Sequence, residues 1–155
     1  MTSIEIVPYA SEYRRSFEKL NSVWIEKYFW MEDVDLNVLR NPEEEIIARG
    51  GMVFFAKEGD SIVGTGAVIN HGNELYEISK MAVDEVFQGR GIGRRIITQA
   101  IDWVEERSGK KIFIETNTLL ETAVNLYEGL GFVSVEDTSG KSHYERTNLH
   151  LELEL

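Results

Sequence analysis

The sequence contains no cysteine, only two prolines and no uninterrupted apolar run of membrane-spanning length. Without cysteine, the chain has no disulfide, no thiolate metal ligand and no thiol nucleophile. Its first residues carry neither the basic region nor the apolar run of a signal peptide. With 155 residues, 43% of them hydrophobic, the chain is long enough to bury one core. We therefore expect a single soluble domain spanning residues 1–155 and a cytoplasmic location.

Positive charge is also scarce. Lysine and arginine number 16 against 27 aspartates and glutamates, so the formal net charge is -11. Such a surface repels nucleic acids and anionic membranes unless a local basic patch opposes the average, and we expect neither as a partner. The three histidines show no spacing typical of metal ligands, so we expect no metal.

Apolar periodicity predicts the elements. A period of two predicts strands at 4–7, 52–57, 62–69, 75–83, 111–116 and 149–155. A helical period predicts helices over 13–28, 92–108 and 119–130. Asn41 as N-cap, Pro42 after it and the following acids predict a further short helix within 41–51. This order indicates a mixed α/β fold whose central strands form an antiparallel meander.

The strand at 75–83 has an irregular apolar phase. Tyr76 and Ile78 share one face, whereas Met81 and Val83 fall on the other face by strict alternation. A β-bulge within 79–81 would restore a single apolar face, and bulges are over-represented next to active sites. The sequence therefore predicts a bulge at this place.

Residues 86–96, VFQGRGIGRRI, place three glycines at alternate positions between this strand and the next helix. Bare amides at the start of a helix, together with its dipole, bind phosphate. A dinucleotide fingerprint requires glycine where Arg94 stands, and a P-loop requires a Gly-Lys-Ser/Thr ending that is absent. The turn therefore predicts a different phosphate ligand, although a turn that only connects a strand to a helix would use the same glycines.

Three stretches together resemble one family. QGRGIG, from Gln88 to Gly93, is similar to the Q/R-x-x-G-x-G/A signature of the GCN5-related N-acetyltransferase (GNAT) superfamily. YEISKMAV resembles the fourth strand of that family, and ETAVNLYEGLGF resembles its later motif A-x-x-L-Y-E-x-x-G-F. The resemblance implies the GNAT fold: a twisted, mostly antiparallel sheet, split near its centre, with helices on both faces.

The resemblance also implies a binding site for acetyl-coenzyme A (acetyl-CoA). Backbone groups of the bulged strand would hold the pantetheine arm, and the glycine turn would cradle the pyrophosphate. Many relatives have a cofactor-binding asparagine where this chain has Leu120, and Asn117 is our substitute, with a purely structural strand-end asparagine as the alternative. The implied cofactor-binding residues are Met81, Ala82, Val83, Gln88, Gly89, Arg90, Gly91, Ile92, Gly93, Arg94 and Asn117.

Two catalytic residues follow from the resemblance. Tyr127 stands where many relatives have the general acid that protonates the departing thiolate; the alternative is a tyrosine that only packs in the core. Glu77 stands where histone-acetylating relatives carry a catalytic base; the alternative is a glutamate at a solvent-facing strand position. The aromatic segment 23–33 is a candidate for the acceptor pocket or for the core.

The expected activity is transfer of an acetyl group from acetyl-CoA directly to a primary amine of a small molecule, an amino acid or a lysine or peptide. The alternatives are an acyl-CoA sensor without turnover, O-acetylation, and transfer of a longer acyl chain. The sequence leaves open the acceptor and whether the chain forms a homodimer.

Overall fold

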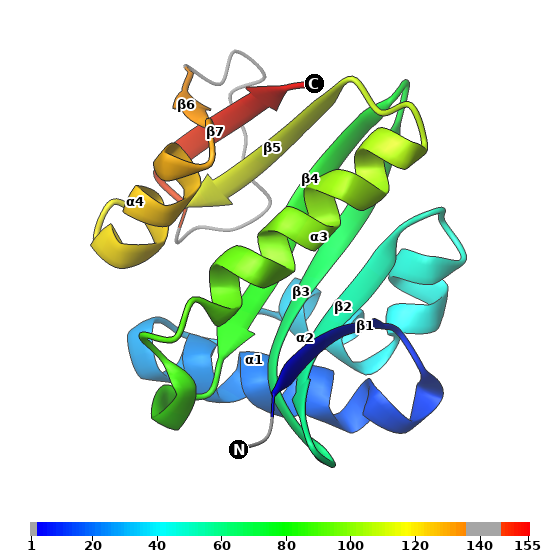
Figure 1. The fold of residues 1–155 in the computed structure, drawn as a ribbon, viewed down its shortest axis with the longest axis vertical. Coiled ribbons are helices and arrows are strands. Elements are labelled where there is room, and N and C mark those ends of the chain that lie inside the picture. Colours follow the sequence, from blue (N-terminus) through cyan, green and yellow to red (C-terminus); the bar gives the residue numbers. More distant parts are fainter. Residues whose placement is uncertain (1–2, 136–146) are drawn as a thin grey trace.

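A computed structural model describes residues 3–135 and 147–155, which form a seven-stranded sheet with helices on both faces (Figure 1). The strands are β1 (Ile4–Pro8), β2 (Met52–Glu58), β3 (Ser61–Gly72), β4 (Leu75–Val83), β5 (Lys111–Thr116), β6 (Val133–Ser134) and β7 (Leu149–Glu154). The helices are α1 (Arg14–Tyr28), α2 (Asp33–Arg40), α3 (Ile92–Glu106) and α4 (Glu121–Gly129), with the short turns η1 (Ser11–Tyr13), η2 (Glu43–Ile47) and η3 (Glu85–Phe87).

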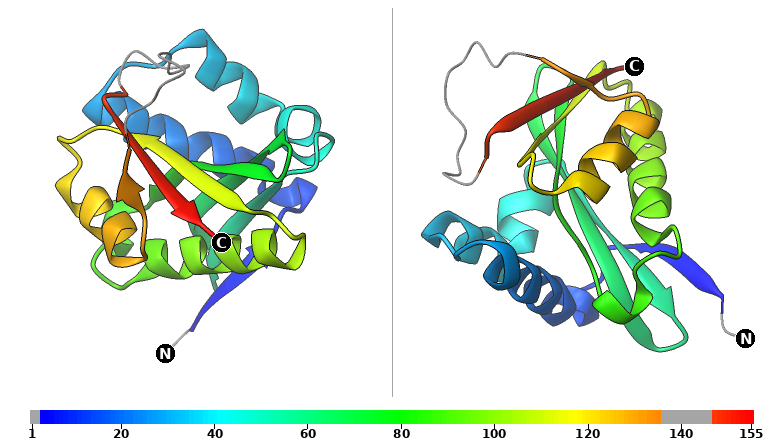
Figure 2. Two further views of the ribbon diagram at one scale, coloured as in Figure 1. Left: turned by 90° about the horizontal axis from the view of Figure 1, so that it is seen from above. Right: turned by 90° about the vertical axis from the view of Figure 1, so that its left-hand side faces the viewer.

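The sheet has the order β1-β2-β3-β4-β5-β7-β6, and all neighbouring strands are antiparallel except β4 and β5. Figure 2 shows the layers: α1 and α2 lie on one face, and α3 and α4 lie on the other. The expected mixed α/β architecture with a mostly antiparallel sheet is confirmed. Among the described residues, no helix combines the length and the apolar character needed to cross a membrane.

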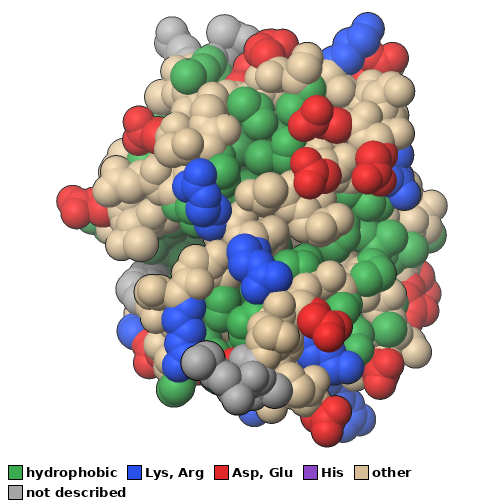
Figure 3. All heavy atoms as spheres, in the orientation of Figure 1, with side chains coloured by type: hydrophobic (Ala, Val, Ile, Leu, Met, Phe, Trp, Pro, Cys, Tyr) green, Lys and Arg blue, Asp and Glu red, His purple; other side chains and the backbone are tan. Residues whose placement is uncertain are grey.

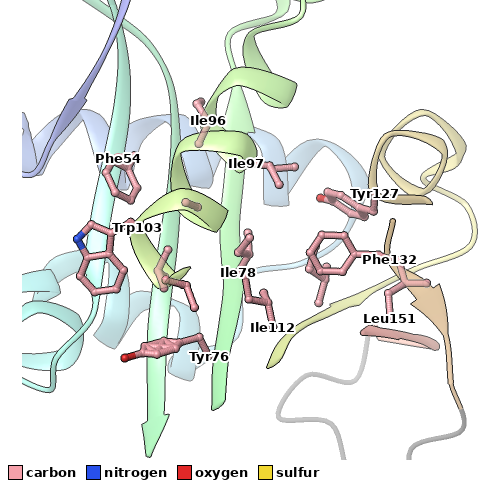
Figure 4. Close-up of a cluster of buried hydrophobic side chains, with 14 of the residues drawn as sticks. Phe54, Tyr76, Ile78, Ile96, Ile97, Trp103, Ile112, Tyr127, Phe132 and Leu151 are labelled. Atoms are coloured by element: carbon pink, nitrogen blue, oxygen red, sulfur yellow. The ribbon is translucent and has the colours of Figure 1, made fainter. Parts of the chain in front are cut away.

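The core has two parts, one on each face of the sheet. Strand β2 reads as a continuous apolar run because both of its faces are buried. Val53 and Phe55 pack with Phe17 of α1, whereas Phe54 packs on the opposite face with Trp103 of α3. Figure 4 shows the second cluster, between the sheet and α3 and α4. The two helix layers therefore pack against opposite apolar faces of the same strands.

Helix α3 follows the predicted pattern. Its apolar stripe is buried, including Ile92, Ile96 and Val104, and its polar stripe is exposed. The helix crosses β3 at two glycines, Gly64 and Gly66, which have no side chains to hold it away. The sequence thus predicts both the helix and the face that it buries.

The segment after α1 differs from the prediction. Asn41 ends α2 instead of capping a new helix, because its backbone N–H and its side-chain amide both donate to the carbonyl oxygen of Asn37, at 3.1 and 3.0 Å. Pro42 precedes only the π-helical turn η2. The sequence missed α2 because its N-terminus is capped by Glu32 and Asp35 rather than by the more common serine or threonine.

The predicted bulge in β4 is confirmed. Thr65 of β3 pairs with Ala82, and Ala67 pairs with Ser79, so one extra residue is inserted on β4. Lys80 lies in this insertion with a φ of 56°, which non-glycine residues rarely adopt. The bulge explains why the apolar side chains on both sides of it face the same core.

Candidate active site

The centre of the sheet opens between β4 and β5. The two strands pair in parallel only from Leu75–Glu77 to Lys111–Phe113, and no further pair forms beyond them. A pocket lies where the strands diverge, and it is also bordered by α1 and α4. Its lining residues are Asn21, Trp24, Ile25, Phe29, Glu77, Ile78, Ser79, Lys80, Met81, Ile114, Glu115, Thr116, Asn117, Leu120, Ala123, Tyr127 and Thr147.

The two predicted catalytic residues reach this pocket from opposite faces of the sheet. Tyr127 belongs to α4 and packs with the core cluster on the α3 side. Glu77 alternates with Tyr76 and Ile78, which face α3, so its side chain points to the α1 side. The pocket therefore passes through the sheet, with a phenol at one end and a carboxylate at the other.

Tyr127 is buried, with 7% of its surface exposed, and its ring contacts Phe132 edge-on at 6.4 Å between centroids. Figure 4 shows its hydroxyl turned away from Phe132 toward β4. Burial raises the pKa of this phenol to about 12, because desolvation disfavours the phenolate. The hydroxyl forms no hydrogen bond with another described residue. The group is therefore a neutral proton donor that faces the pocket.

Glu77 is also buried, with 7% exposed, and so the alternative of a solvent-facing glutamate is wrong. Its Oε1 lies 2.8 Å from Nε2 of His71, which is near the end of β3. A solvent-facing glutamate would require one face of β4 to be exposed, but β4 is an inner strand of the sheet and helices cover both of its faces. A carboxylate with a hydrogen-bonded imidazole is chemically able to accept a proton at this end of the pocket.

The bulge forms one wall of the pocket through Ser79, Lys80 and Met81. Lys80 Nζ donates to Asp35 Oδ1 of α2 at 2.6 Å, and both side chains are almost fully buried. Asp35 Oδ2 accepts the backbone N–H of Glu32 at 3.1 Å, at the start of the same helix. One aspartate thus ties the start of α2 to the bulge.

The glycine turn lies at the start of α3, after the bulge along the chain. Gly89 and Gly91 have φ values of 83° and 74°, and a Cβ at either would meet no atom within 4 Å. Gly91 is the N-cap of α3, so the free amides of the first turn follow it directly. The turn has an exposed, side-chain-free backbone at a helix N-terminus, which is the geometry that a phosphate requires.

The other predicted turn residues differ in what they can contribute. Gln88 is exposed, and its Nε2 donates to the carbonyl oxygen of Val83 at 3.3 Å. The Ile92 side chain is buried, so only its backbone faces the turn. Arg90 lies over the Phe87 ring, 5.0 Å from its centroid. Figure 3 shows basic side chains gathered near the start of α3 and acidic ones along its second half.

Four further predicted residues lie close to the turn or the bulge. Ala82 is buried, while Val83 is half-buried at the end of β4. Gly93 lies in the first turn of α3, where an added Cβ would be 3.4 Å from Leu126 of α4. Arg94, the residue after Gly93, is exposed. Of the predicted cofactor-binding residues, Met81 and Asn117 line the pocket, and those from Ala82 to Arg94 follow Met81 along the chain to the glycine turn and the first turn of α3.

Asn117 lines the pocket, and it also shapes the chain after β5. Its Oδ1 accepts the N–H of Leu119 at 2.9 Å, and its carbonyl oxygen accepts the N–H of Leu120 at the same distance. Asn117 therefore has the structural role at the end of β5 that was the alternative to cofactor binding. Leu120 lines the pocket as well, so an apolar side chain occupies the place of the family asparagine.

The aromatic segment contributes to the pocket more than its periodicity indicates. Trp24 and Phe29 line the α1 side, with their ring centroids 6.0 Å apart. Sequence reasoning missed His71 as a partner of Glu77, and it missed Asp35, which lies 45 residues before Lys80. No local pattern indicates the Lys80–Asp35 contact over 45 residues, whereas the contact between His71 and Glu77, six residues apart, depends on the register of the β3–β4 hairpin. His143, one of the three histidines for which we expect no metal, lies outside the described residues.

The comparisons with known proteins agree with this geometry. The model of the Acetyltransferase (GNAT) family matches residues 10–132. N-alpha-acetyltransferase RimI of Mycobacterium tuberculosis is 32% identical over 83 residues, which cover 52% of this chain. The chain spans about half of that relative's length, since the match covers 51% of it.

Solved structures share the fold over nearly the whole chain. An acetyltransferase of the GNAT family from Staphylococcus aureus MU50 superposes with a TM-score of 0.89 at 21% identity and covers 98% of this chain and 99% of its own. The yncA protein from Salmonella typhimurium, solved with its cofactor acetyl-CoA, has a TM-score of 0.78 at 16% identity and covers 99% and 94%. Since the family model also matches most of the sequence, the chain belongs to the acetyltransferase (GNAT) family.

Proposed function

We propose that this protein transfers an acetyl group from acetyl-CoA directly to a primary amine. Family membership supports the reaction class, and the neighbour solved with acetyl-CoA supports the co-substrate. The name of the mycobacterial relative points to an amino-terminal acceptor, yet the match covers only half of that protein. A small amine, an amino acid and a lysine or peptide amine all remain acceptors to be tested.

The residues present fit acetyl-CoA. The open turn at Gly89 and Gly91 offers backbone amides to the pyrophosphate, and the exposed Arg94 adds positive charge. The bulge from Ser79 to Met81 interrupts the pairing of β3 with β4 at the pocket wall, and we expect the backbone near Met81 to contact the pantetheine arm and the thioester oxygen there. Asn117 would add a polar contact where β5 ends.

Each catalytic residue has one task in this scheme. Glu77 takes a proton from the acceptor ammonium, whose pKa in a free lysine is about 10.4. The amine lone pair then attacks the thioester carbon, and amides near Met81 stabilise the oxyanion. The nitrogen loses its second proton to water as the tetrahedral intermediate collapses to the amide. Tyr127 donates its proton to the sulfur as the carbon–sulfur bond breaks, because a thiol is a better leaving group than a thiolate.

The observation that carries this proposal is the pocket through the sheet. Glu77 lies on one side of it and Tyr127 on the other, as a base for the incoming amine and an acid for the leaving sulfur require. Trp24 and Phe29 on the Glu77 side would contact the acceptor, since aromatic faces attract cationic groups.

The first experiment measures release of free coenzyme A from acetyl-CoA by the purified protein, across amines, amino acids, polyamines and lysine peptides. Release that depends on one acceptor supports the proposal and identifies the acceptor class. Acetyl-CoA binding without release for any acceptor would contradict it and favour an acyl-CoA sensor.

The second experiment tests Tyr127. We expect Tyr127→Phe to lower kcat about 100-fold while the Kd for acetyl-CoA stays within about twofold, because only proton donation is lost. Since the raised pKa of about 12 keeps the phenol protonated, this group should not reduce the wild-type rate as the pH rises to about 10.

Tyr76→Phe is the matched control. Tyr76 is equally buried, at 7% exposed, but packs against Trp103 and does not line the pocket. Equal losses of kcat in both variants would contradict a role of Tyr127 as the acid.

A further inference from the structure

His71 is the polar neighbour of the proposed base. Its Nε2 lies 2.8 Å from Glu77 Oε1, and the two residues come from adjacent strands, β3 and β4. The exposure of their side chains differs: 9% for Glu77 and 29% for His71. The imidazole therefore connects a nearly buried carboxylate to a position that water reaches.

Packing holds this imidazole in place. Its ring lies 5.1 Å from the ring of Phe113 on β5, measured between centroids. On the other side of Phe113, His150 of β7 stacks at 5.2 Å. The other titratable groups near this stack are Glu152, whose Oε2 is 3.0 Å from His150 Nε2, and Glu115, whose Oε1 is 3.9 Å from His150 Nδ1. The hydrogen-bond partner of His71 is Glu77, whereas Glu152 and Glu115 lie next to His150.

We propose that His71 is a positioning residue for Glu77 and carries the proton from Glu77 to solvent in each turnover. This inference rests on the proposed function, in which Glu77 is the base. A carboxyl that has taken a proton in a nearly closed pocket must lose it before the next amine binds. A base held by a third group is the usual arrangement in acyl transfer, because the hydrogen bond fixes its orientation.

The proton balance is simple. Glu77 takes one proton from the acceptor ammonium and becomes a neutral carboxylic acid. That acid donates the proton to the bare Nε2 of the Nδ1–H tautomer of His71, which becomes an imidazolium hydrogen-bonded to the Glu77 carboxylate. The imidazolium loses its Nδ1 proton to water, and a solvent-mediated change of tautomer moves the remaining proton from Nε2 to Nδ1 before the next turnover. The amine nitrogen loses its second proton to solvent as the amide forms, and solvent replaces the proton that Tyr127 gave to the sulfur. Glu77, His71 and Tyr127 then return to their starting states, and each turnover releases one proton in total.

A double-mutant cycle on kcat tests this proposal with His71→Ala, Glu77→Gln and the double variant, at saturating acetyl-CoA and acceptor. We expect His71→Ala to lower kcat about tenfold in the wild-type background and less than about twofold in the Glu77→Gln background, because residues that act as one unit are not additive. Added imidazole should restore part of the rate of His71→Ala and none of that of Glu77→Gln.

His150→Ala is the matched control, since it removes the same ring from the other side of Phe113 without touching Glu77. We expect it to keep kcat within about twofold of the wild type. A role in packing alone predicts equal losses for His71→Ala in both backgrounds and no rescue by imidazole, and either result would overturn the proposal. If the wild type transfers acetyl groups and His71→Ala keeps its full rate, only this inference fails; if the wild type transfers none, the proposed function fails and this inference fails with it.

Discussion

Two parts of the proposed cofactor site are made mainly of backbone, yet they are built in opposite ways. The glycine turn at Gly89 and Gly91 is open, since an added Cβ would meet nothing within 4 Å. The bulge at Lys80 is enclosed, and its side chain pairs with Asp35 of α2 in the interior. Both contain positive φ angles, but only the turn uses glycine for them.

The difference shows how each shape is maintained. At the turn, glycine adopts the left-handed conformation without steric cost, so neighbouring residues in the sequence suffice. At the bulge, a lysine adopts it at a cost, and contacts with a distant helix must offset that cost. Changes at the bulge should therefore affect the whole fold, whereas changes at the turn should affect mainly binding.

The largest expected effect is at the ion pair. Asp35→Ala leaves the buried Lys80 ammonium without its carboxylate and removes the cap on Glu32, so we expect the free energy of unfolding to fall by about 3–5 kcal/mol. Equilibrium unfolding in urea measures it. Combining Asp35→Leu with Lys80→Met should recover most of the loss, because no charge is then left unpaired. A loss below about 1 kcal/mol for Asp35→Ala would show that the pair does not hold the bulge.

A smaller effect is expected where β3 backs the bulge. A Cβ at Gly66 would lie 2.3 Å from Met81 Sδ and 2.9 Å from Ile96 Cγ2, so Gly66→Ala should cost about 1–3 kcal/mol of stability and raise the KM for acetyl-CoA by displacing Met81. Thermal unfolding and steady-state kinetics measure the two effects.

Gly64→Ala is the control on the same strand. Its nearest atoms, on Ile92 and Ile96, would lie at 3.1 and 3.2 Å, and Met81 is not among its closest neighbours. Its stability loss should be the smaller of the two, with an unchanged KM. An equal rise in KM for both variants would contradict the role of Met81.

The smallest effect on stability is expected at the turn. Gly91→Ala should cost about 1–2 kcal/mol, because alanine must adopt a φ of 74° there. Since the turn would bind the pyrophosphate, we also expect acetyl-CoA to bind about tenfold more weakly, as measured by isothermal titration calorimetry.

Gly72→Ala provides the comparison, with a φ of 81° and open space in the β3–β4 hairpin, away from the glycine turn. It should lose similar stability and keep the affinity for acetyl-CoA. If both variants bind acetyl-CoA as tightly as the wild type, the turn is only a connection between η3 and α3.

Much of the fold could be predicted from periodicity. Helix α3 and strand β7 carry clear apolar stripes, and the phase slip in β4 placed the bulge correctly, because each pattern reflects one buried face. Helix α2 was missed, and Asn41 was misplaced, because short helices with acidic caps carry weak signals. For the site, motif positions indicated Tyr127 and Glu77, while their environments were not readable from the sequence.

The sequence by itself determined the glycine turn, the helix that follows it and the apolar faces of the strands, because these depend on residues a few positions apart. Only the tertiary structure decided that the split expected from the family resemblance begins between β4 and β5 after three residue pairs, and that the β3–β4 register brings His71 to Glu77. It also decided that Asp35 reaches Lys80. Such contacts depend on how distant elements pack, and the free energy of packing is a property of the whole core rather than of any local stretch.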